Sequence, residues 1–384
     1  MSEWREYIME DVIDRFIDYR GKTPTKTNSG IPLVTAKIVK SGKILPPNEF
    51  IAAEDYDSWM TRGLPEVDDV VLTTEAPLGE VALIKNKNVA LAQRIITLRG
   101  KKEYIFNPFL KYYFQNDTGQ HELQSRASGT TVSGIKASVL KKMPINIPGV
   151  EAQKAIAAVL ISLDDKIDLL SRQIKTLETM AYTLFRQWFL EDAGDSWTER
   201  PLSKTARFLN GLACQKYPPE NDLEKLPVLK IRELSSGISE ASDWATNQVK
   251  PDYIIEAGDV IFAWSASLMV KVWDGERCVL NQHLFKVTSD EFPKWFYLLW
   301  CKHHLAEFIS ISSSHATTMG HIKRGDLDAA MVLVPPPREL EVMSKQMEPL
   351  LDKQIANAKQ IDSLEKLRDN LLPKLMSGEV RVSY

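Results

Sequence analysis

Apolar residues recur at alternating steps of four and three along two long stretches, from about Glu151 to Leu190 and from about Arg338 to Ser377. This spacing places them on one stripe of a helix, as in the seam of a coiled coil. The predicted seam consists of Leu163, Ile167, Leu170, Ile174 and Leu177 in the first stretch and Leu350, Ile361, Leu364 and Leu371 in the second. Because a seam of this length needs a partner, we expect the two helices to form an antiparallel coiled coil.

The two stretches are copies of each other. Leu163 corresponds to Leu350 and Leu184 to Leu371, each pair 187 residues apart and without a gap between them. At the same offset, three seam positions of the second stretch are polar, namely Gln354, Asn357 and Arg368. Polar residues in a seam cost stability but fix register and partner.

The repeat continues upstream of both helices. The matching segments are Glu66–Leu72 with Glu256–Phe262, Leu91–Leu98 with Leu280–Val287, and Thr130–Lys136 with Thr317–Lys323. The offset between copies changes in the loops and becomes constant where the helices begin. The chain is therefore an internal pseudo-twofold repeat, and this constrains its architecture more than any single residue.

The segments upstream of the helices contain short apolar runs bounded by Gly, Pro, Asn or Asp, which predict strands. These runs are Ile31–Ile38, Val67–Thr73, Glu80–Ile84 and Ala90–Leu98, then Pro227–Ile231, Asp259–Ala263, Val270–Trp273 and Leu280–Val287. Helices are expected at Asn107–Gln115, with a possible extension over His121–Ala127, and at Pro293–Ile311. The predicted class is α+β, with similar globular domains at 1–150 and 193–337 and helices at 151–192 and 338–384.

Composition narrows the possible functions. The chain has 384 residues, 44% of them hydrophobic, and a net charge of −3. A protein that coats DNA non-specifically is usually basic, so DNA binding would need local patches or a partner's charge. The three cysteines show no CxxC spacing, which argues against a disulfide framework or a cysteine-rich zinc site. There is no apolar signal-peptide core and no run of about 18 apolar residues, so we expect a cytoplasmic protein without membrane spans.

Several resemblances to catalytic motifs are incomplete. Gly21-Lys22-Thr23 is similar to the end of a P-loop, but Phe16 stands where the loop needs a glycine. The segment beginning Asn107-Pro108 lacks the second proline of the adenine-methyltransferase box, and no glycine-rich cofactor loop follows a strand nearby. No carboxylate cluster closes on a Glu-x-Lys, as a nuclease would need. We therefore expect neither a catalytic centre nor a metal site in this chain.

Polar loop positions that recur in both copies are the strongest candidates for a recognition surface. Gln93 and Arg94 precede a predicted strand whose counterpart carries Asn281, Gln282 and His283. Asn, Gln and Arg side chains can pair with purine edges through two hydrogen bonds. Hydroxyl-rich loops beside basic residues are suited to phosphate contacts. Their candidate residues are Arg126, Ser128, Thr130, Thr131 and Lys136 in the first copy and His315, Thr317, Thr318, His321 and Lys323 in the second. The alternative for each residue is an ordinary turn or a structural amide at a strand end.

The chain resembles the DNA-specificity (S) subunit of type I restriction–modification systems. The residues that carry the resemblance lie in and around the helices: Pro144–Pro148, Gln153–Ala157, Leu163–Asp168, Leu184–Phe189 and Leu371–Val380. The resemblance covers the layout of the whole chain and is weaker in the globular parts. It implies two target-recognition domains, each reading one half of a bipartite double-stranded DNA site, joined by two conserved helices that set the half-site spacing.

The resemblance also implies partners. Two adenine-N6 methyltransferase (M) subunits that use S-adenosylmethionine would dock on the helices, and restriction (R) subunits that use ATP and magnesium would join through them. The S subunit itself would hold no cofactor and catalyse nothing. Two other interpretations stay open: a coiled-coil scaffold that does not bind DNA, and a fused restriction–methylation enzyme, against which the missing motifs argue.

Overall fold

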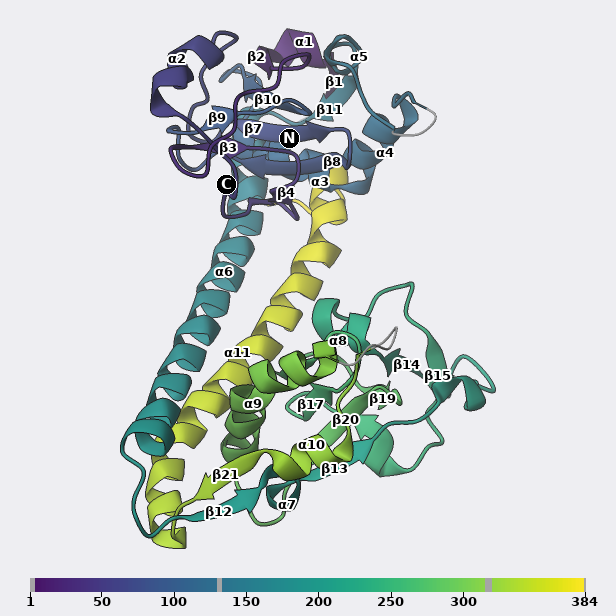
Figure 1. Ribbon diagram of the computed structural model, residues 1–384. Helices are drawn as coiled ribbons and strands as arrows, with labels where there is room; N and C mark the ends of the chain where they lie inside the picture. The colour runs from purple at the N-terminus through teal and green to yellow at the C-terminus, as the bar shows by residue number, and fades with distance from the viewer. Residues whose placement is uncertain (1–3, 130–132, 315–319, 383–384) are drawn as a thin grey trace. The chain divides into compact units, whose positions relative to one another are not determined.

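The computed structural model describes residues 4–129, 133–314 and 320–382. The chain forms two compact units, one from Met1–Asp165 with Lys366–Tyr384 and one from Lys166–Glu365 (Figure 1). Each unit holds one globular part and a portion of both long helices. The mixed α+β class predicted from the sequence is confirmed.

The first unit is built on a four-stranded antiparallel sheet. Its order is β2 (Ile13–Asp18), β10 (Ile95–Gly100), β7 (Val70–Thr74) and β8 (Leu78–Leu83). A smaller sheet joins β3 (Ile31–Val34) to β6 (Phe50–Ile51) and, in parallel, to β9 (Ala90–Leu91). A hairpin of β4 (Val39–Lys40) and β5 (Lys43–Ile44) and a ribbon of β1 (Arg5–Ile8) with β11 (Pro144–Ile147) complete the strands of the described residues.

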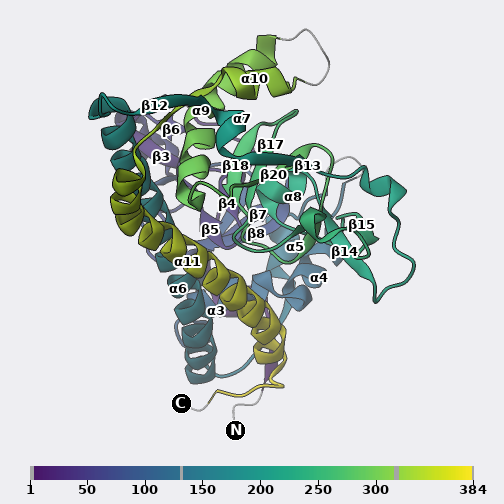
Figure 2. The ribbon, with the colours of Figure 1, turned by 90° about the horizontal axis from the view of Figure 1, so that it is seen from below.

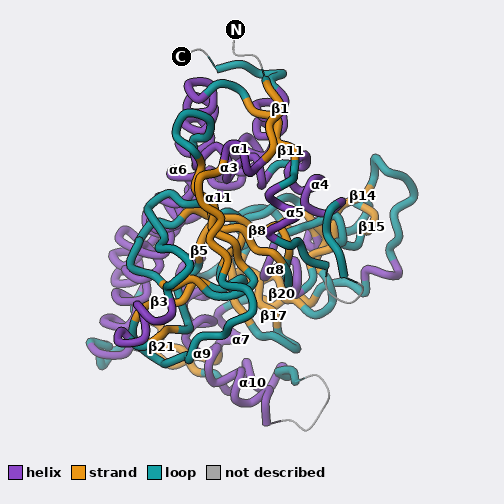
Figure 3. Tube along the Cα trace, turned by 90° about the horizontal axis from the view of Figure 1, so that it is seen from above, coloured by secondary structure: helices purple, strands orange, loops and turns teal. Residues whose placement is uncertain are grey.

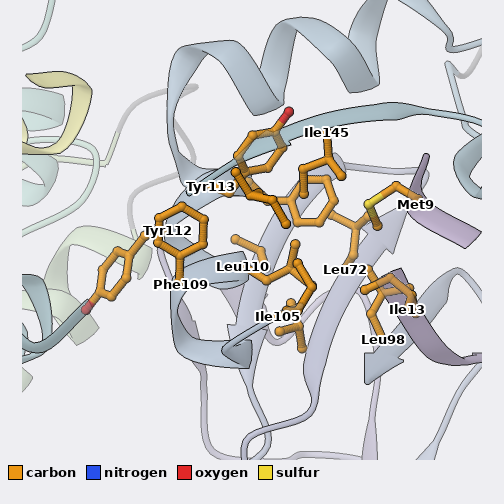
Figure 4. Close-up of a cluster of buried hydrophobic side chains, with 14 of the residues drawn as sticks. Met9, Ile13, Leu72, Leu98, Ile105, Phe109, Leu110, Tyr112, Tyr113 and Ile145 are labelled. Carbon is orange, nitrogen blue, oxygen red and sulfur yellow. The ribbon is translucent and has the colours of Figure 1, made fainter. Parts of the chain in front are cut away.

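One face of this sheet is covered by helices. The helices of the unit's globular part are α1 (Met9–Val12), α2 (Tyr56–Trp59), α3 (Asn107–Gln115), α4 (Asp117–Ser125) and α5 (Ala137–Lys141). Helix α3 packs against β7 and β8, and its Phe109 and Leu110 enter a core with Leu72 and Leu98 of the sheet (Figure 4). The expected helix over Asn107–Gln115 is confirmed. The backbone turns to an extended conformation at Asn116, so the following segment forms a separate helix instead of extending α3.

The second unit repeats this plan in the order of its strands. Figure 3 draws the strands in orange and the helices in purple. Its main sheet runs β13 (Arg207–Asn210), β20 (Leu284–Thr288), β17 (Val260–Ala263), β18 (Met269–Val272). The smaller sheet runs β15 (Trp244–Thr246), β14 (Lys225–Leu229), β19 (Cys278–Leu280), β16 (Ile254–Ile255), with β14 and β19 parallel. The ribbon pairs β12 (Thr198–Pro201) with β21 (Met331–Val334). Its helices are α7 (Leu202–Thr205), α8 (Ile231–Ser236), α9 (Lys294–Ser314) and α10 (Arg324–Ala329).

The repeat extends to the pairing register. Leu72 stands opposite Ile96 in the first unit, and the corresponding Phe262 stands opposite Phe285 in the second. In both units the third and fourth strands of the main sheet are neighbours in sequence, and the helix packed on the sheet follows its second strand. The internal repeat inferred from the sequence is therefore a repeat of the fold.

One expected strand is wrong in both copies. The run Ala90–Leu98 divides into β9 and β10, which belong to different sheets, and Leu280–Val287 divides likewise into β19 and β20. The chain changes sheet at the turn between them, which contains Gln93 and Arg94 in one unit and Gln282 and His283 in the other. Both flanking strands are buried and apolar, so hydrophobicity alone does not reveal the break.

The two long helices are α6 (Val150–Arg186), which ends in a π-helical turn at Gln187–Glu191, and α11 (Pro337–Ser377). Within the first unit, Asp164 contacts Arg368 while Ala152 lines a hollow with Leu375. Within the second unit, Gln173 is hydrogen-bonded to Asn357, and Ala181, further along α6, lines a pocket with Met347, which comes earlier in α11. The helices are thus antiparallel in each unit (Figure 2). Supercoiling along their whole length stays a prediction. In the described parts of the chain, no helix is long and apolar enough to cross a membrane.

Candidate nucleic-acid interface

Three segments distant in sequence meet at one edge of the first unit's main sheet. They are the turn with Gln93 and Arg94, the end of β7 with Thr74 and Glu75, and the exit of the hydroxyl-rich loop at Gly134 and Ile135. The Thr74 N–H donates to the Arg94 carbonyl at 2.9 Å, and the Ile135 N–H donates to the Thr74 carbonyl at 3.0 Å. We call this arrangement the loop junction.

The second unit has the same junction. The Trp264 N–H donates to the His283 carbonyl at 3.3 Å, and the Ile322 N–H donates to the Trp264 carbonyl at 3.1 Å. Ser265 pairs with His321 as Glu75 pairs with Gly134. The structure therefore brings the two groups of candidates predicted from the sequence, the strand-end turn and the loop exit, together in each unit. The backbone frame is repeated and the side chains on it differ.

At the first junction the side chains form a charged pair. Arg94 Nε lies 3.0 Å from Glu75 Oε1, and both side chains are open to solvent. Arg94 has a φ of 71°, in the left-handed region that non-glycine residues seldom occupy. Beside it, Gln93 Oε1 accepts a hydrogen bond from Thr23 Oγ1 at 3.4 Å. The Arg94 guanidinium and the Gln93 amide thus lie on a turn whose backbone is hydrogen-bonded to Val34 through Ala92 and to Thr74 through Arg94.

At the second junction the side chains are polar and aromatic. Ser265 Oγ lies 3.1 Å from His283 Nδ1, and Gln282 Nε2 lies 3.4 Å from His283 Nε2. The Trp264 ring stands 6.0 Å from the ring of His283 and 6.2 Å from that of His321. Asn281, by contrast, is buried and accepts the His283 N–H at 3.3 Å. Asn281 therefore shapes the turn, whereas Gln282, His283 and His321 are partly exposed on it.

The candidates for phosphate contact have different surroundings. Ser128 is exposed and pairs through its backbone with Gly134 at 2.9 and 3.0 Å. Arg126, the residue that caps the C-terminus of α4, forms an ion pair with Glu122 of that helix. Lys136 and Lys323 are both exposed and immediately precede α5 and α10, and the backbone N–H of Lys323 is bonded to the Asp326 carboxylate at 2.6 Å. Thr130, Thr131, His315, Thr317 and Thr318 lie outside the described residues.

In the first unit the helix pair is joined to the globular part by a buried charge network. Asp164 of α6 accepts hydrogen bonds from Lys111 Nζ at 2.8 Å and from the Tyr112 hydroxyl at 2.7 Å, both on α3. Its other oxygen accepts from Arg368 of α11 at 3.2 Å. One carboxylate thus holds three helices together, and Arg368 is one of the polar seam residues noted in the sequence.

The charge state of this network follows from its burial and its partners. Burial alone would raise the pKa of the Asp164 carboxyl, but Lys111, Tyr112 and Arg368 together bring that pKa below its usual value. Burial raises the pKa of the Tyr112 hydroxyl, which therefore stays a hydrogen-bond donor. Because the folded pKa of Asp164 is lowered, its contribution to stability is present above the unfolded value of about 3.9 and is lost as the pH falls through the folded pKa.

Replacing Asp164 with asparagine is expected to lower the free energy of unfolding by about 3–5 kcal/mol, because Lys111 would remain buried without a counter-charge. Lys111 is only 7% exposed, so water cannot replace the carboxylate. Chemical denaturation of the full chain at neutral pH measures this loss. The matched control is the exposed neighbour Asp165, where Asp165→Asn should change stability by less than about 0.5 kcal/mol. Equal losses in the two variants would contradict the network's role.

In the second unit the helices meet through a polar pair and apolar neighbours. Asn357 is 1% exposed, and its Nδ2 donates to Gln173 Oε1 at 3.1 Å. Of the predicted seam positions, Ile167 and Leu170 are buried. Those that are half-buried are Leu163, Ile174, Leu177, Leu350, Ile361, Leu364 and Leu371. This hydrogen bond favours one register of the two helices, because a slip would leave the buried Asn357 amide without its exposed partner Gln173.

Residues 1–179 and 195–366 match the type I restriction modification DNA specificity domain, once in each half of the chain. The chain belongs to this family of type I restriction–modification specificity subunits. The two matched regions coincide with the two copies of the repeat, so the family assignment rests on both units.

Individual relatives agree with this assignment. The MjaIX specificity subunit of Methanocaldococcus jannaschii is 27% identical over 82% of this chain and 78% of its own length. The EcoKI specificity subunit of Escherichia coli K12 is 23% identical over 74% of this chain and 68% of its own. The solved S subunit of a type I system from M. genitalium covers 97% of this chain and 96% of its own, with a TM-score of 0.62 and 15% identity. That last likeness supports the fold.

As a member of the family, this specificity subunit is a non-catalytic component of a restriction–modification complex that acts on DNA, and it needs no cofactor of its own. Among its described residues, no group of three or more His, Cys, Asp or Glu is arranged to hold a metal ion. The family match assigns sequence recognition to this subunit. The loop junctions and the helix pair are therefore our candidate surfaces for contacts with DNA and with partner proteins.

Sequence reasoning missed several residues at these sites. Glu75 and Ser265 lie one and two residues after the matching strands β7 and β17, and their equivalence could have been found by extending the repeat alignment at an offset of 190 residues. Trp264 could have been noticed as an aromatic residue at the end of a buried strand. For Lys111 there was no signal, because its partner Asp164 is 53 residues away in another helix.

Proposed function

We propose that this specificity subunit recognises a bipartite site in double-stranded DNA, with residues 1–150 reading one half and residues 193–337 the other. The observation that carries the proposal is the repeated loop junction. The same backbone hydrogen bonds hold Arg94 and Glu75 in one unit and His283 and Ser265 in the other. A constant frame with different side chains suits two units that read different bases on similar backbones.

Within each unit we assign base contacts to the turn and backbone contacts to the loop exit. Gln93 and Arg94, and likewise Gln282 and His283, stand on turns where they are partly or fully exposed, so their amide, guanidinium and imidazole groups can reach base edges. Lys136 and Lys323 follow the hydroxyl-rich loops, where a positive charge can track the phosphates. Two units docked along one face of a duplex favour half-sites about one helical turn apart, roughly 34 Å.

The helix pair is the proposed docking surface for two methyltransferase subunits, and its length would set the half-site spacing. Those partners would supply S-adenosylmethionine chemistry, and restriction subunits joined through them would use ATP and magnesium. This division places recognition in this chain and catalysis in its partners, acting together in the cytoplasm. The contacts between the two helices within each unit support the proposal, through Asp164 and Arg368 in the first unit and Gln173 and Asn357 in the second.

Mapping of adenine methylation in a host tests the proposal. Cells carrying the methyltransferase subunit with this chain should methylate one bipartite sequence with two constant half-sites and a fixed spacer. Cells carrying the methyltransferase subunit alone should show none of these sites. Methylation that is identical with and without this chain, or that follows a single uninterrupted sequence, would contradict the bipartite reading.

A further inference from the structure

The guanidinium of Arg94 is oriented by an ion pair with Glu75. Only its Nε is engaged, by Glu75 Oε1 at 3.0 Å, and within the described part of the chain its two terminal nitrogens have no partner. The side chain is 54% exposed while that of Glu75 is 36% exposed. The free end of the guanidinium is thus a two-pronged donor facing solvent, with the carboxylate behind it.

The backbone under this side chain is also held. Arg94 has a left-handed φ of 71°, and its carbonyl accepts a hydrogen bond from the Thr74 N–H at 2.9 Å. The adjoining loop exit is held by Arg20, whose Nη2 donates to the Ile135 carbonyl at 2.8 Å. A long flexible side chain on a mobile turn loses entropy when it binds, and one held at both its backbone and its Nε loses less. The arrangement therefore favours a contact that depends on direction.

The Glu75 carboxylate indicates whether Arg94 contacts a phosphate or a base edge. An arginine that neutralises phosphates gains nothing from an acidic neighbour, because Glu75 would repel the same phosphates. A base edge has no net charge, and there the carboxylate costs little while it fixes the guanidinium plane. Guanine offers the matching pair of acceptors, N7 and O6, in the major groove.

The second unit lacks this chemistry at the equivalent place. His283 and Ser265 share one hydrogen bond at 3.1 Å, and the remaining imidazole nitrogen lies 3.4 Å from the Gln282 amide. Neither side chain offers two parallel donors on a rigid plane. The two junctions are therefore equipped for different bases, and the guanidinium fork belongs to the first alone.

We propose that Arg94 reads a guanine in the half-site recognised by the first unit, and that Glu75 is a positioning residue that holds the guanidinium for it. The inference rests on the proposed function and deepens it by naming a base and the residue pair responsible. It concerns the first half-site only, since the second junction carries Ser265 and His283.

The test uses the complete complex of this chain with its methyltransferase subunits and duplexes that carry the mapped bipartite site. Each position of the first half-site is changed to the other three bases, and binding is measured for the wild type, Arg94→Ala, Arg94→Lys and Glu75→Gln. The wild type should prefer guanine at one position by about 5- to 150-fold. Arg94→Ala should remove that preference and leave the other positions intact. Arg94→Lys should keep the salt dependence of binding but lose most of the preference, because an ammonium lacks the fork.

Glu75→Gln separates positioning from simple charge. It should reduce the preference for guanine while non-specific binding stays equal or becomes tighter, since a negative charge has left the interface. Ser265→Ala is the matched variant in the second unit and should affect only the second half-site. Undisturbed reading of that half-site by the Arg94 and Glu75 variants shows that they are folded.

Distinct results would overturn the inference. If no position of the first half-site requires guanine, or if Arg94→Ala weakens all duplexes evenly, Arg94 does not read guanine although bipartite recognition stands. Unchanged discrimination in Glu75→Gln would remove the positioning role. If the wild-type complex has no bipartite preference at all, the proposed function fails together with the inference.

Discussion

Substitution of Leu170 by aspartate is expected to destabilise the helix pair of the second unit severely. Leu170 is 2% exposed and lies in α6, three residues after the buried Ile167. Gln173, which bonds to Asn357 of α11, follows three residues later in the same helix. Loss of a buried leucine side chain alone costs about 2–5 kcal/mol. A carboxylate in its place adds the cost of leaving water, and the total approaches the whole stability of a typical domain, about 5–15 kcal/mol. Denaturant unfolding and assembly with the methyltransferase subunits both measure this loss.

The neighbouring residue supplies the control. Leu169 is 41% exposed, and Leu169→Asp introduces the same charge one residue away with an expected change within about 0.5 kcal/mol. Leu170→Met keeps the volume and apolar character and should cost less than about 1.5 kcal/mol. If Leu169→Asp were as damaging as Leu170→Asp, the position of the buried stripe on this helix would be wrong.

The long helices could be predicted closely because their signal is local and repeated. The alternating steps of four and three indicated a helix from about Glu151 to Leu190, and the structure has α6 over Val150–Arg186 with a π-helical turn to Glu191. The expected start near Arg338 compares with Pro337 in α11. Over this length many residues agree on one period, so the errors at single positions cancel.

The strands were less predictable because burial hides their ends. The single run Ala90–Leu98 contains a change of sheet at Arg94, and the flanking residues on both sides are buried. The ribbon strands Arg5–Ile8 and Thr198–Pro201 were missed altogether, since they are charged and only partly covered. Their pairing with Pro144–Ile147 and Met331–Val334 is made by contacts distant in sequence, which composition does not record.

The candidate site was predictable in kind but not in detail. The repeat alone indicated that Gln93, Arg94 and the loop before Lys136 are equivalent to segments of the second copy. It could not show that Arg94 is bonded to Glu75, because the ion pair depends on a turn that brings two strands' ends together. The same holds for Asn281, which the sequence grouped with the base readers and which the structure places inside its turn.

Exchange of residues 193–337 for the equivalent unit of a relative is expected to change one half-site of the methylated sequence completely and leave the other as it is. The physical reason is that every hydrogen bond of the second junction is made within this segment, from Trp264 and His283 to Ile322. The segment also contains both strands of the ribbon that closes the unit, Thr198–Pro201 and Met331–Val334. The methylation map of a host carrying the hybrid measures the outcome.

The design must preserve the contacts between the exchanged unit and the helices of this chain. Trp300 packs against Phe185 with ring centroids 5.0 Å apart, and Trp295 Nε1 donates to Ser344 Oγ at 2.9 Å. The graft therefore keeps Trp295 and Trp300, since without them the aromatic core at the helix pair would be opened. A second hybrid carrying the relative's residues only at Ser265, His283 and His321 separates the junction from the rest of the unit. A change in both half-sites would show that the two units do not read DNA independently. A change in neither would show that residues 193–337 play no part in the choice of bases.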